Sequence, residues 1–122
     1  MLSTFEELFG KQIENQKEIL ERGYYDGIEK RVFSEKLKIP FDSPKLVSFH
    51  VQQLISEIGE LLSADKRWKS FRNEKLDSEN KLEEIADCFI VMMNIAMFSG
   101  YSAEDVLKAI EKKIAIVNNR IK

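Results

Sequence analysis

The chain has 122 residues, a formal net charge of -2 and a single cysteine, Cys88, so we expect no disulfide framework and no bulk attraction to nucleic acid or anionic membranes. Its hydrophobic fraction of 43% and charged fraction of 33% are typical of a globular domain, and its apolar runs are too short to cross a bilayer. One histidine and one cysteine do not support a zinc site. We therefore predict one cytoplasmic domain, residues 1–122, with no nucleic-acid or membrane partner.

The first predicted helix spans about residues 4–22, and Gly23 is placed to end it. Gln12, Asn15 and Gln16 lie on or beside its apolar face. Two interpretations are open: polar groups at the edge of a helix interface, which the periodicity favours, or hydrogen-bonding groups that read the edge of a base. A long connection, residues 23–43, follows, and a short helix within residues 28–37 is possible.

The second predicted helix begins with Ser43 as N-cap and Pro44 in the first turn. Its apolar stripe and the polar stripe on its shoulder have helical spacing. The apolar stripe is expected to form the core and consists of Val47, Val51, Leu54, Ile58 and Leu61; the shoulder consists of His50, Gln53, Glu57 and Glu60. A lone histidine in this position is more often packed than a ligand.

The segment 64–77 is rich in basic residues around two aromatic side chains, Trp68 and Phe71. One interpretation is a solvated loop with aromatic anchors. The other is a phosphate-binding segment with an aromatic ring available for stacking.

The third predicted helix runs from about residue 78 or 80 to residue 98, where Ser99 and Gly100 end it. It is apolar almost all round, so we expect it to be buried on most sides. The fourth predicted helix begins at the N-cap Ser102. Lys113 and Arg120 lie one heptad apart on the shoulder of this helix. They are either surface cations or residues that donate hydrogen bonds to phosphate.

Two acidic pairs dominate the sequence. Glu57 and Glu60 lie three residues apart on the second predicted helix, and Glu84 and Asp87 have the same spacing on the third. Carboxylates in an apolar helix need compensation of their charge. Ion pairs with Lys or Arg are one possibility, but the pattern favours a divalent cation, and hard oxygen ligands suit Mg²⁺ or Mn²⁺.

With these residues, the chain resembles the all-α nucleoside triphosphate pyrophosphohydrolases, that is, the MazG family and the dimeric dUTPases. The resemblance lies in the E-x-x-E motif of Glu57 and Glu60, the E-x-x-D motif of Glu84 and Asp87, and the Trp-basic element, residues 66–71, between them. Lys113 and Arg120 look like the basic residues near the C-terminus of the family. Ser56 and Val117 depart from the pattern, at positions where many relatives have Glu and Asn.

The resemblance implies a four-helix bundle-like fold and hydrolysis of a nucleoside triphosphate, such as dUTP or dCTP, to monophosphate and pyrophosphate. The four carboxylates would hold Mg²⁺, with Mn²⁺ as a possible substitute, and Glu57 or Glu60 would activate water. The implied phosphate-binding residues are Lys69, Arg72, Lys113 and Arg120. The implied base- or sugar-binding residues are Gln12, Asn15, Gln16, Trp68 and Phe71.

The apolar third helix also predicts a partner chain, so we expect a homodimer or homotetramer. The alternative function is a non-catalytic helical module of the same fold, for nucleotide binding, dimerisation or regulation. A di-iron carboxylate bundle is disfavoured because it needs Glu-x-x-His pairs, and His50 belongs to none.

Overall fold

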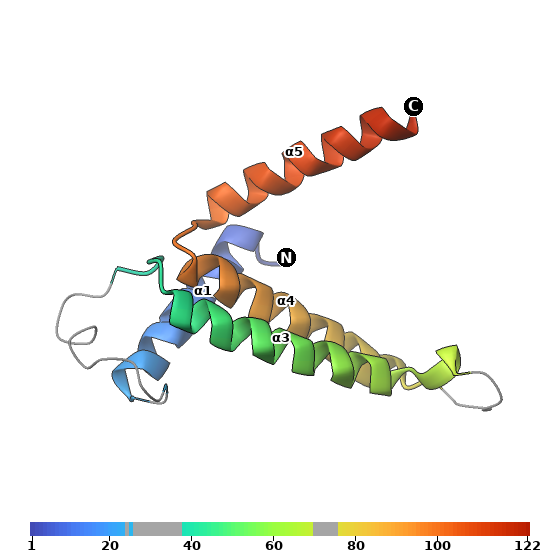
Figure 1. The fold of residues 1–122 in the computed structure, drawn as a ribbon, viewed down its shortest axis with the longest axis horizontal. Coiled ribbons are helices and arrows are strands. Elements are labelled where there is room, and N and C mark those ends of the chain that lie inside the picture. The colour runs from blue at the N-terminus through green and yellow to red at the C-terminus, as the bar shows by residue number, and fades with distance from the viewer. Residues whose placement is uncertain (24, 26–37, 70–75) are drawn as a thin grey trace. The chain divides into compact units, whose positions relative to one another are not determined.

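The computed structural model describes residues 1–23, 25, 38–69 and 76–122. Within these ranges the chain forms four α-helices and one short 3-10 helix, with an isolated β-bridge between Asp42 and Ser99 (Figure 1). The predicted all-α class is therefore confirmed. None of the described helices combines the length and apolarity needed to cross a membrane. The contacts group the chain into two compact units: Met1–Ser43 with Ala96–Lys122, and Pro44–Ile95.

The first unit begins with α1 (Phe5–Glu21), close to the predicted bounds. Thr4 caps this helix reciprocally with Glu7: the Glu7 backbone N–H donates to Thr4 Oγ1 at 3.1 Å, and the Thr4 N–H donates to the Glu7 carboxylate at 3.3 Å. This capping box satisfies backbone donors that an α-helix leaves free at its N-terminus. Gly23, with a φ of 71°, follows the C-cap Arg22, as expected.

The last helix of this unit is α5 (Ala103–Ile121), which contacts α1. Ser102 is its N-cap, as predicted, and forms a second capping box with Asp105. Its apolar side chains recur at intervals of four, three and four residues but remain exposed: Ile110, Ile114, Val117 and Ile121.

Aromatic packing in the first unit centres on the buried Phe98. The rings of Phe41 and Tyr25 meet it edge-on, with centroids 5.6 and 6.4 Å away. The chain leaves the helix through Gly100, whose φ of 87° is a conformation that glycine adopts without the strain of a side chain. The predicted helix end at Ser99 and Gly100 is therefore confirmed.

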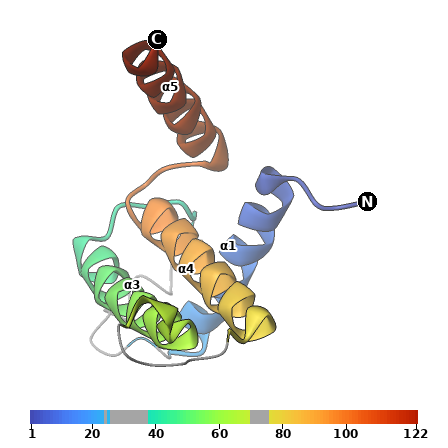
Figure 2. The same cartoon turned by 90° about the vertical axis from the view of Figure 1, so that its right-hand side faces the viewer.

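The second unit is a helical hairpin. It consists of α3 (Pro44–Ala64), the 3-10 helix η1 (Lys66–Trp68) and α4 (Ser78–Phe98), whose last three residues belong to the first unit. Two views at right angles show α3 and α4 side by side and antiparallel (Figures 1 and 2). The predicted start of α3 at Pro44 is confirmed. The possible helix within residues 28–37 lies outside the described residues.

The buried face of α3 differs from the predicted one. Leu46 and His50 are buried, whereas Val51 and Ile58, assigned to the core stripe, are exposed. The inward face of α3 therefore lies between the two predicted stripes: it includes His50 and Glu57 from the expected shoulder, whereas Gln53 and Glu60 of that shoulder are exposed. His50 is packed, as the sequence favoured: its ring lies edge-on to Phe49, and Nδ1 is 3.2 Å from Oε1 of Gln53.

The expectation that α4 is buried on most sides was wrong for the single chain. Val91 and Asn94 are buried, but Leu82 and Phe89 are 67% and 66% exposed. The hairpin gives α4 only one neighbouring helix within the second unit. An apolar helix with one such neighbour keeps part of its surface exposed, however regular its sequence.

Candidate functional site

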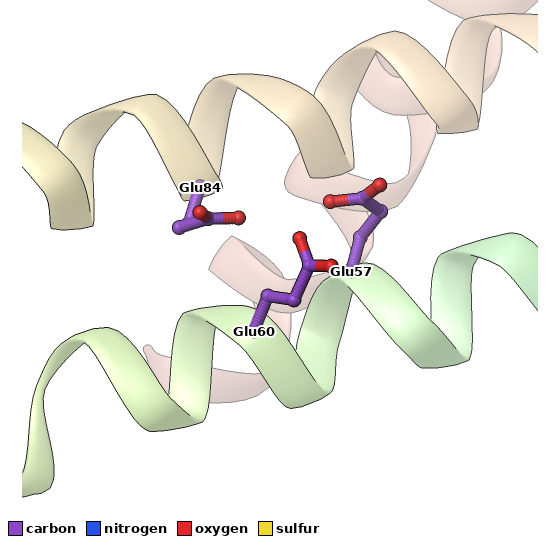
Figure 3. Close-up of side chains that lie close together, drawn as sticks. All are labelled: Glu57, Glu60 and Glu84. Carbon is purple, nitrogen blue, oxygen red and sulfur yellow. The ribbon is translucent and has the colours of Figure 1, made fainter.

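The acidic residues of the two helices meet across the hairpin. Glu57 and Glu60 project from α3 toward α4, and Glu84 projects from α4 toward them (Figure 3). One carboxylate oxygen of each residue lies within 4.8 Å of those of the other two. The i, i+3 spacing places Glu57 and Glu60 on one side of α3, and antiparallel pairing brings Glu84 opposite them. We call these three residues the carboxylate cluster.

The carboxylate cluster is partly removed from water without being neutralised. Glu57 and Glu84 are half-buried, whereas Glu60 is exposed. The Oε2 atoms of Glu57 and Glu84 are buried and have no hydrogen-bond partner within the described parts of the chain. Such atoms are uncommon in folded proteins because an unpaired buried polar group loses its hydration. Their burial therefore carries an energetic cost that no contact among the described residues offsets.

The electrostatics of the cluster favour protonation. Burial raises the pKa of Glu57, and the hydrogen bond and negative charge of Glu60 raise it further. Burial likewise raises the pKa of Glu84, followed by repulsion from Glu60. A divalent cation would act in the opposite direction, because it stabilises the ionised form of each carboxylate.

Asp87, the fourth carboxylate of the predicted set, is exposed on α4 and does not belong to the close group of three. Its negative charge still contributes to the raised pKa of both Glu57 and Glu84. Cys88, beside it, is half-buried, and its thiol has a pKa raised by burial and then by the carboxylates. The role of Asp87 as a ligand remains a prediction.

The ion-pair explanation of the acidic pairs finds no support in the described residues. Within them, no Lys or Arg forms an ion pair with the carboxylate cluster or with Asp87. Two cations near the cluster in sequence, Arg67 and Lys81, instead bind Asp65, at 2.7 and 2.8 Å. These contacts lower the pKa of Asp65, with the hydrogen bond from Arg67 as the largest cause.

The Trp-basic element is described as far as Lys69. Trp68 is 57% exposed, and its Nε1–H donates to the backbone oxygen of Leu62 at 3.1 Å. The Lys69 ammonium lies 5.3 Å from the centroid of the Trp68 ring. The indole edge is therefore engaged by the end of α3, while much of the ring is accessible for stacking. Phe71 and Arg72 lie outside the described residues.

The amides of α1 have different environments. Asn15 donates to Oε1 of Gln12 at 3.3 Å, and both line a surface depression of about 380 Å³. Gln16 is buried, and its amide oxygen accepts a hydrogen bond from the Tyr25 hydroxyl. Gln12 and Asn15 are thus placed at a surface, whereas Gln16 is engaged in packing within the first unit. A base-reading role stays a prediction for all three.

Lys113 and Arg120 are exposed on α5, in the first unit, whereas the carboxylate cluster belongs to the second. Phosphate binding by these two residues therefore also remains a prediction.

Sequence reasoning missed the contacts of Asp65 and Tyr25. Asp65 pairs with Lys81, which is 16 residues away, and Tyr25 pairs with Gln16 across the end of α1. Neither contact follows a helical spacing, so periodicity gives no sign of them. The only local signal is the position of Asp65 directly after α3, where a carboxylate can cap the following turn: it accepts from the Arg67 backbone N–H at 3.2 Å.

Comparison with known proteins gives no match: no family model, curated protein or solved structure is significantly similar to this chain.

Proposed function

We propose that the chain hydrolyses a nucleoside triphosphate, or deoxynucleoside triphosphate, to the monophosphate and pyrophosphate in a Mg²⁺-dependent reaction. A pyrimidine deoxynucleotide such as dUTP or dCTP is the favoured substrate class. The proposal combines the resemblance of the two acidic motifs to the all-α pyrophosphohydrolases with the geometry of the helical hairpin.

The observation that carries the proposal is the pair of unpartnered oxygens in the carboxylate cluster. Glu57 and Glu84 each have one buried oxygen without a partner among the described residues, and Glu60 lies between them. The donor set consists of hard oxygens, which suit Mg²⁺ or Mn²⁺. Asp87, one turn beyond Glu84, would complete the four ligands. The residues therefore fit the cation that the resemblance implies.

A bound Mg²⁺ would supply positive charge against the triphosphate oxygens and would acidify water. The chain would supply the proton acceptor: Glu57 or Glu60 would orient a water molecule and take its proton at a carboxylate oxygen. Burial raises the pKa of Glu57, which makes its ionised form a stronger base than an ordinary glutamate carboxylate.

The remaining residues would bind the substrate. Lys69, Arg72, Lys113 and Arg120 would neutralise phosphate charge, as basic residues do in phosphoryl-transfer sites. The exposed face of Trp68, with Phe71, would stack on the base or sugar, and the amides of α1 would read a base edge.

We also propose that the chain acts as a homodimer or homotetramer. Three helices expose apolar side chains at helical spacing, which a second copy would cover. On α3 these residues are Val51, Ile55, Ile58 and Leu62; on α4 they are Leu82, Phe89, Ile90 and Met92; on α5 they are Ile110, Ile114, Val117 and Ile121.

The test is release of monophosphate and pyrophosphate from a panel of ribo- and deoxynucleoside triphosphates, with Mg²⁺ and with a chelator. We expect Mg²⁺-dependent cleavage that Glu57→Gln and Glu84→Gln abolish. Glu83→Gln is the matched control, because Glu83 is exposed on the same helix outside the carboxylate cluster. Its activity should equal that of the parent chain.

The non-catalytic module remains the alternative. It predicts that the folded chain binds Mg²⁺ or nucleotide while every nucleoside triphosphate in the panel stays intact. That outcome would rule out the hydrolase and retain the fold.

A further inference from the structure

Asp65, between α3 and η1, holds two cations at once. Its Oδ1 accepts from Nε of Arg67 at 2.8 Å, and its Oδ2 accepts from the Arg67 guanidinium at 2.7 Å. The same Oδ2 accepts from the Lys81 ammonium at 2.8 Å. The Asp65 side chain is only 14% exposed, so this contact links the end of α3 to the first turns of α4 in a partly buried setting.

The position of Lys81 makes this contact consequential. Lys81 precedes Glu84 by three residues on α4, a spacing at which a cation and a carboxylate on a helix commonly pair. Glu84 is nevertheless without a cationic partner among the described residues, and its Oε2 is unpartnered and buried. The ammonium that is nearest to Glu84 along the helix is held by Asp65 instead.

We propose that Asp65 is a positioning residue that keeps the Lys81 ammonium away from Glu84, so that the carboxylate cluster stays available to a divalent cation. This inference rests on the proposed function, because it assumes that the cluster binds such a cation. A Lys81 ammonium paired with Glu84 would compete directly with the cation for a ligand and would repel it.

A simpler role for Asp65 is to anchor the loop between the two helices. The two roles make different predictions for Lys81. If Asp65 only anchors the loop, removing Lys81 cannot repair the loss of Asp65. If Asp65 sequesters Lys81, removing both restores the cluster, because the freed ammonium is the cause of the defect.

The experiment measures Mn²⁺ affinity by calorimetry, without nucleotide, for the parent chain, D65N, D65N/K81M and R67M. We expect D65N to raise the Mn²⁺ Kd by about fivefold, the upper range for one exposed ion pair. D65N/K81M should return to within about twofold of the parent. The control R67M removes the other partner of Asp65 without freeing Lys81 and should bind like the parent.

Salt provides a second readout that loop anchoring would not change. The ratio of the Mn²⁺ Kd of D65N to that of D65N/K81M should fall toward one as the ionic strength rises, because the difference comes from a single exposed charge. Circular dichroism establishes that each variant is folded. Should D65N unfold, D65S with and without K81M serves for the same comparison, because the serine hydroxyl can still accept from the Arg67 backbone N–H but carries no charge to hold Lys81.

Two results would overturn the inference. One is that D65N binds Mn²⁺ as the parent does; the other is that D65N/K81M binds Mn²⁺ as weakly as D65N. Either result leaves Asp65 with a purely structural role and leaves the proposed cation site intact. A parent chain that binds no Mn²⁺ is a different result, because it removes the proposed function together with the role of Asp65.

Discussion

Glu57 and Glu84 face each other across the α3–α4 hairpin, each with a buried carboxylate oxygen that lacks a partner among the described residues (Figure 3). Two like charges in this position oppose the pairing of the helices that carry them. A bound cation, as proposed above, would offset this repulsion, and stability measurements provide a direct check of that proposal.

The first prediction concerns divalent cations. Mg²⁺ or Mn²⁺ at about 100 times its Kd should stabilise the folded chain by about 2.7 kcal/mol, because the folded state alone presents the assembled cluster. Thermal melting with cation and with chelator measures the difference. Glu57→Gln should abolish this stabilisation, whereas Glu83→Gln should keep it. Equal melting temperatures for the parent chain in both conditions would contradict a cation site.

The second prediction concerns pH. The pKa values of Glu57 and Glu84 are raised from 4.5, so the folded state retains protons that the unfolded state has released. Without divalent cations, this contribution to stability is fully present below about pH 4.5 and is lost as the pH rises through the folded pKa values. Urea unfolding from about pH 4.5 to pH 7 measures it.

Other carboxylates act in the opposite direction at lower pH. The pKa of Asp105 is lowered, mainly by the backbone hydrogen bond at Ser102, so its contribution is present above its ordinary pKa and is lost on acidification. The control for the cluster is Glu60→Gln, which removes the charge that adds to burial in raising the pKa values of Glu57 and Glu84. It should reduce the pH dependence of stability between about pH 4.5 and pH 7 without abolishing it, because burial still raises both pKa values; an unchanged slope would exclude Glu60 as a contributor.

The third prediction separates the two parts of Trp68. Trp68→Phe removes the hydrogen bond to Leu62 but keeps an aromatic ring, and should destabilise the fold by about 0.5–1.5 kcal/mol. Nucleotide affinity should change little in this variant. Trp68→Leu should weaken nucleotide binding by about 1–3 kcal/mol if the ring stacks on a base. Titration with a fluorescent nucleotide analogue, corrected for folding, compares the two variants, since neither retains a tryptophan; equal affinities would exclude stacking.

The fourth prediction concerns the contact between Tyr25 and Gln16. Tyr25→Phe removes the hydroxyl that donates to the buried amide oxygen and should destabilise the chain by about 1–2 kcal/mol. The pKa of the Tyr25 hydroxyl is raised to about 12, chiefly by burial, so the parent should ionise at higher pH than an exposed tyrosine. Urea unfolding and ultraviolet titration measure the two effects; full stability in Tyr25→Phe would contradict the contact.

The fifth prediction concerns the assembly. Sedimentation equilibrium should give a mass of two or four chains at micromolar concentration. Ile114→Glu places a charge in the exposed apolar stripe of α5 and should weaken association if a second copy covers this stripe. Lys112→Glu, on the exposed polar side of α5, is the control for the change of charge. A monomeric parent chain would contradict the proposed oligomer.

Local signals predicted the elements well. Capping residues and helix breakers act within a few residues of their own positions, so Ser102, Pro44 and Gly100 mark helix boundaries that the structure confirms. The rotation of α3 was not predictable in the same way. Hydrophobicity alone favoured a face with Val51 and Ile58, but the hairpin turns the neighbouring face inward, with the partly polar set that includes His50 and Glu57.

The two acidic pairs of the candidate site could be predicted because their i, i+3 spacing can be read directly from the amino-acid sequence. The structure brings three of the four residues together and leaves Asp87 outside the close group. The pairing of Asp65 with Lys81 depends on where α3 ends and α4 begins in space, and the periodicity of the sequence does not predict that. Phe71 and Arg72 lie outside the described residues, so their predicted roles in substrate binding stay predictions.

The hairpin also has a consequence for the order of folding. All four acidic residues, and the Asp65–Lys81 contact with its separation of 16 residues, belong to one continuous stretch of chain. Contacts between nearby segments form with the smallest loss of chain entropy, so this stretch is suited to nucleate the fold. Repulsion between Glu57 and Glu84 would then act on the nucleus itself. A divalent cation bound at that early stage would accelerate folding as well as stabilise its product.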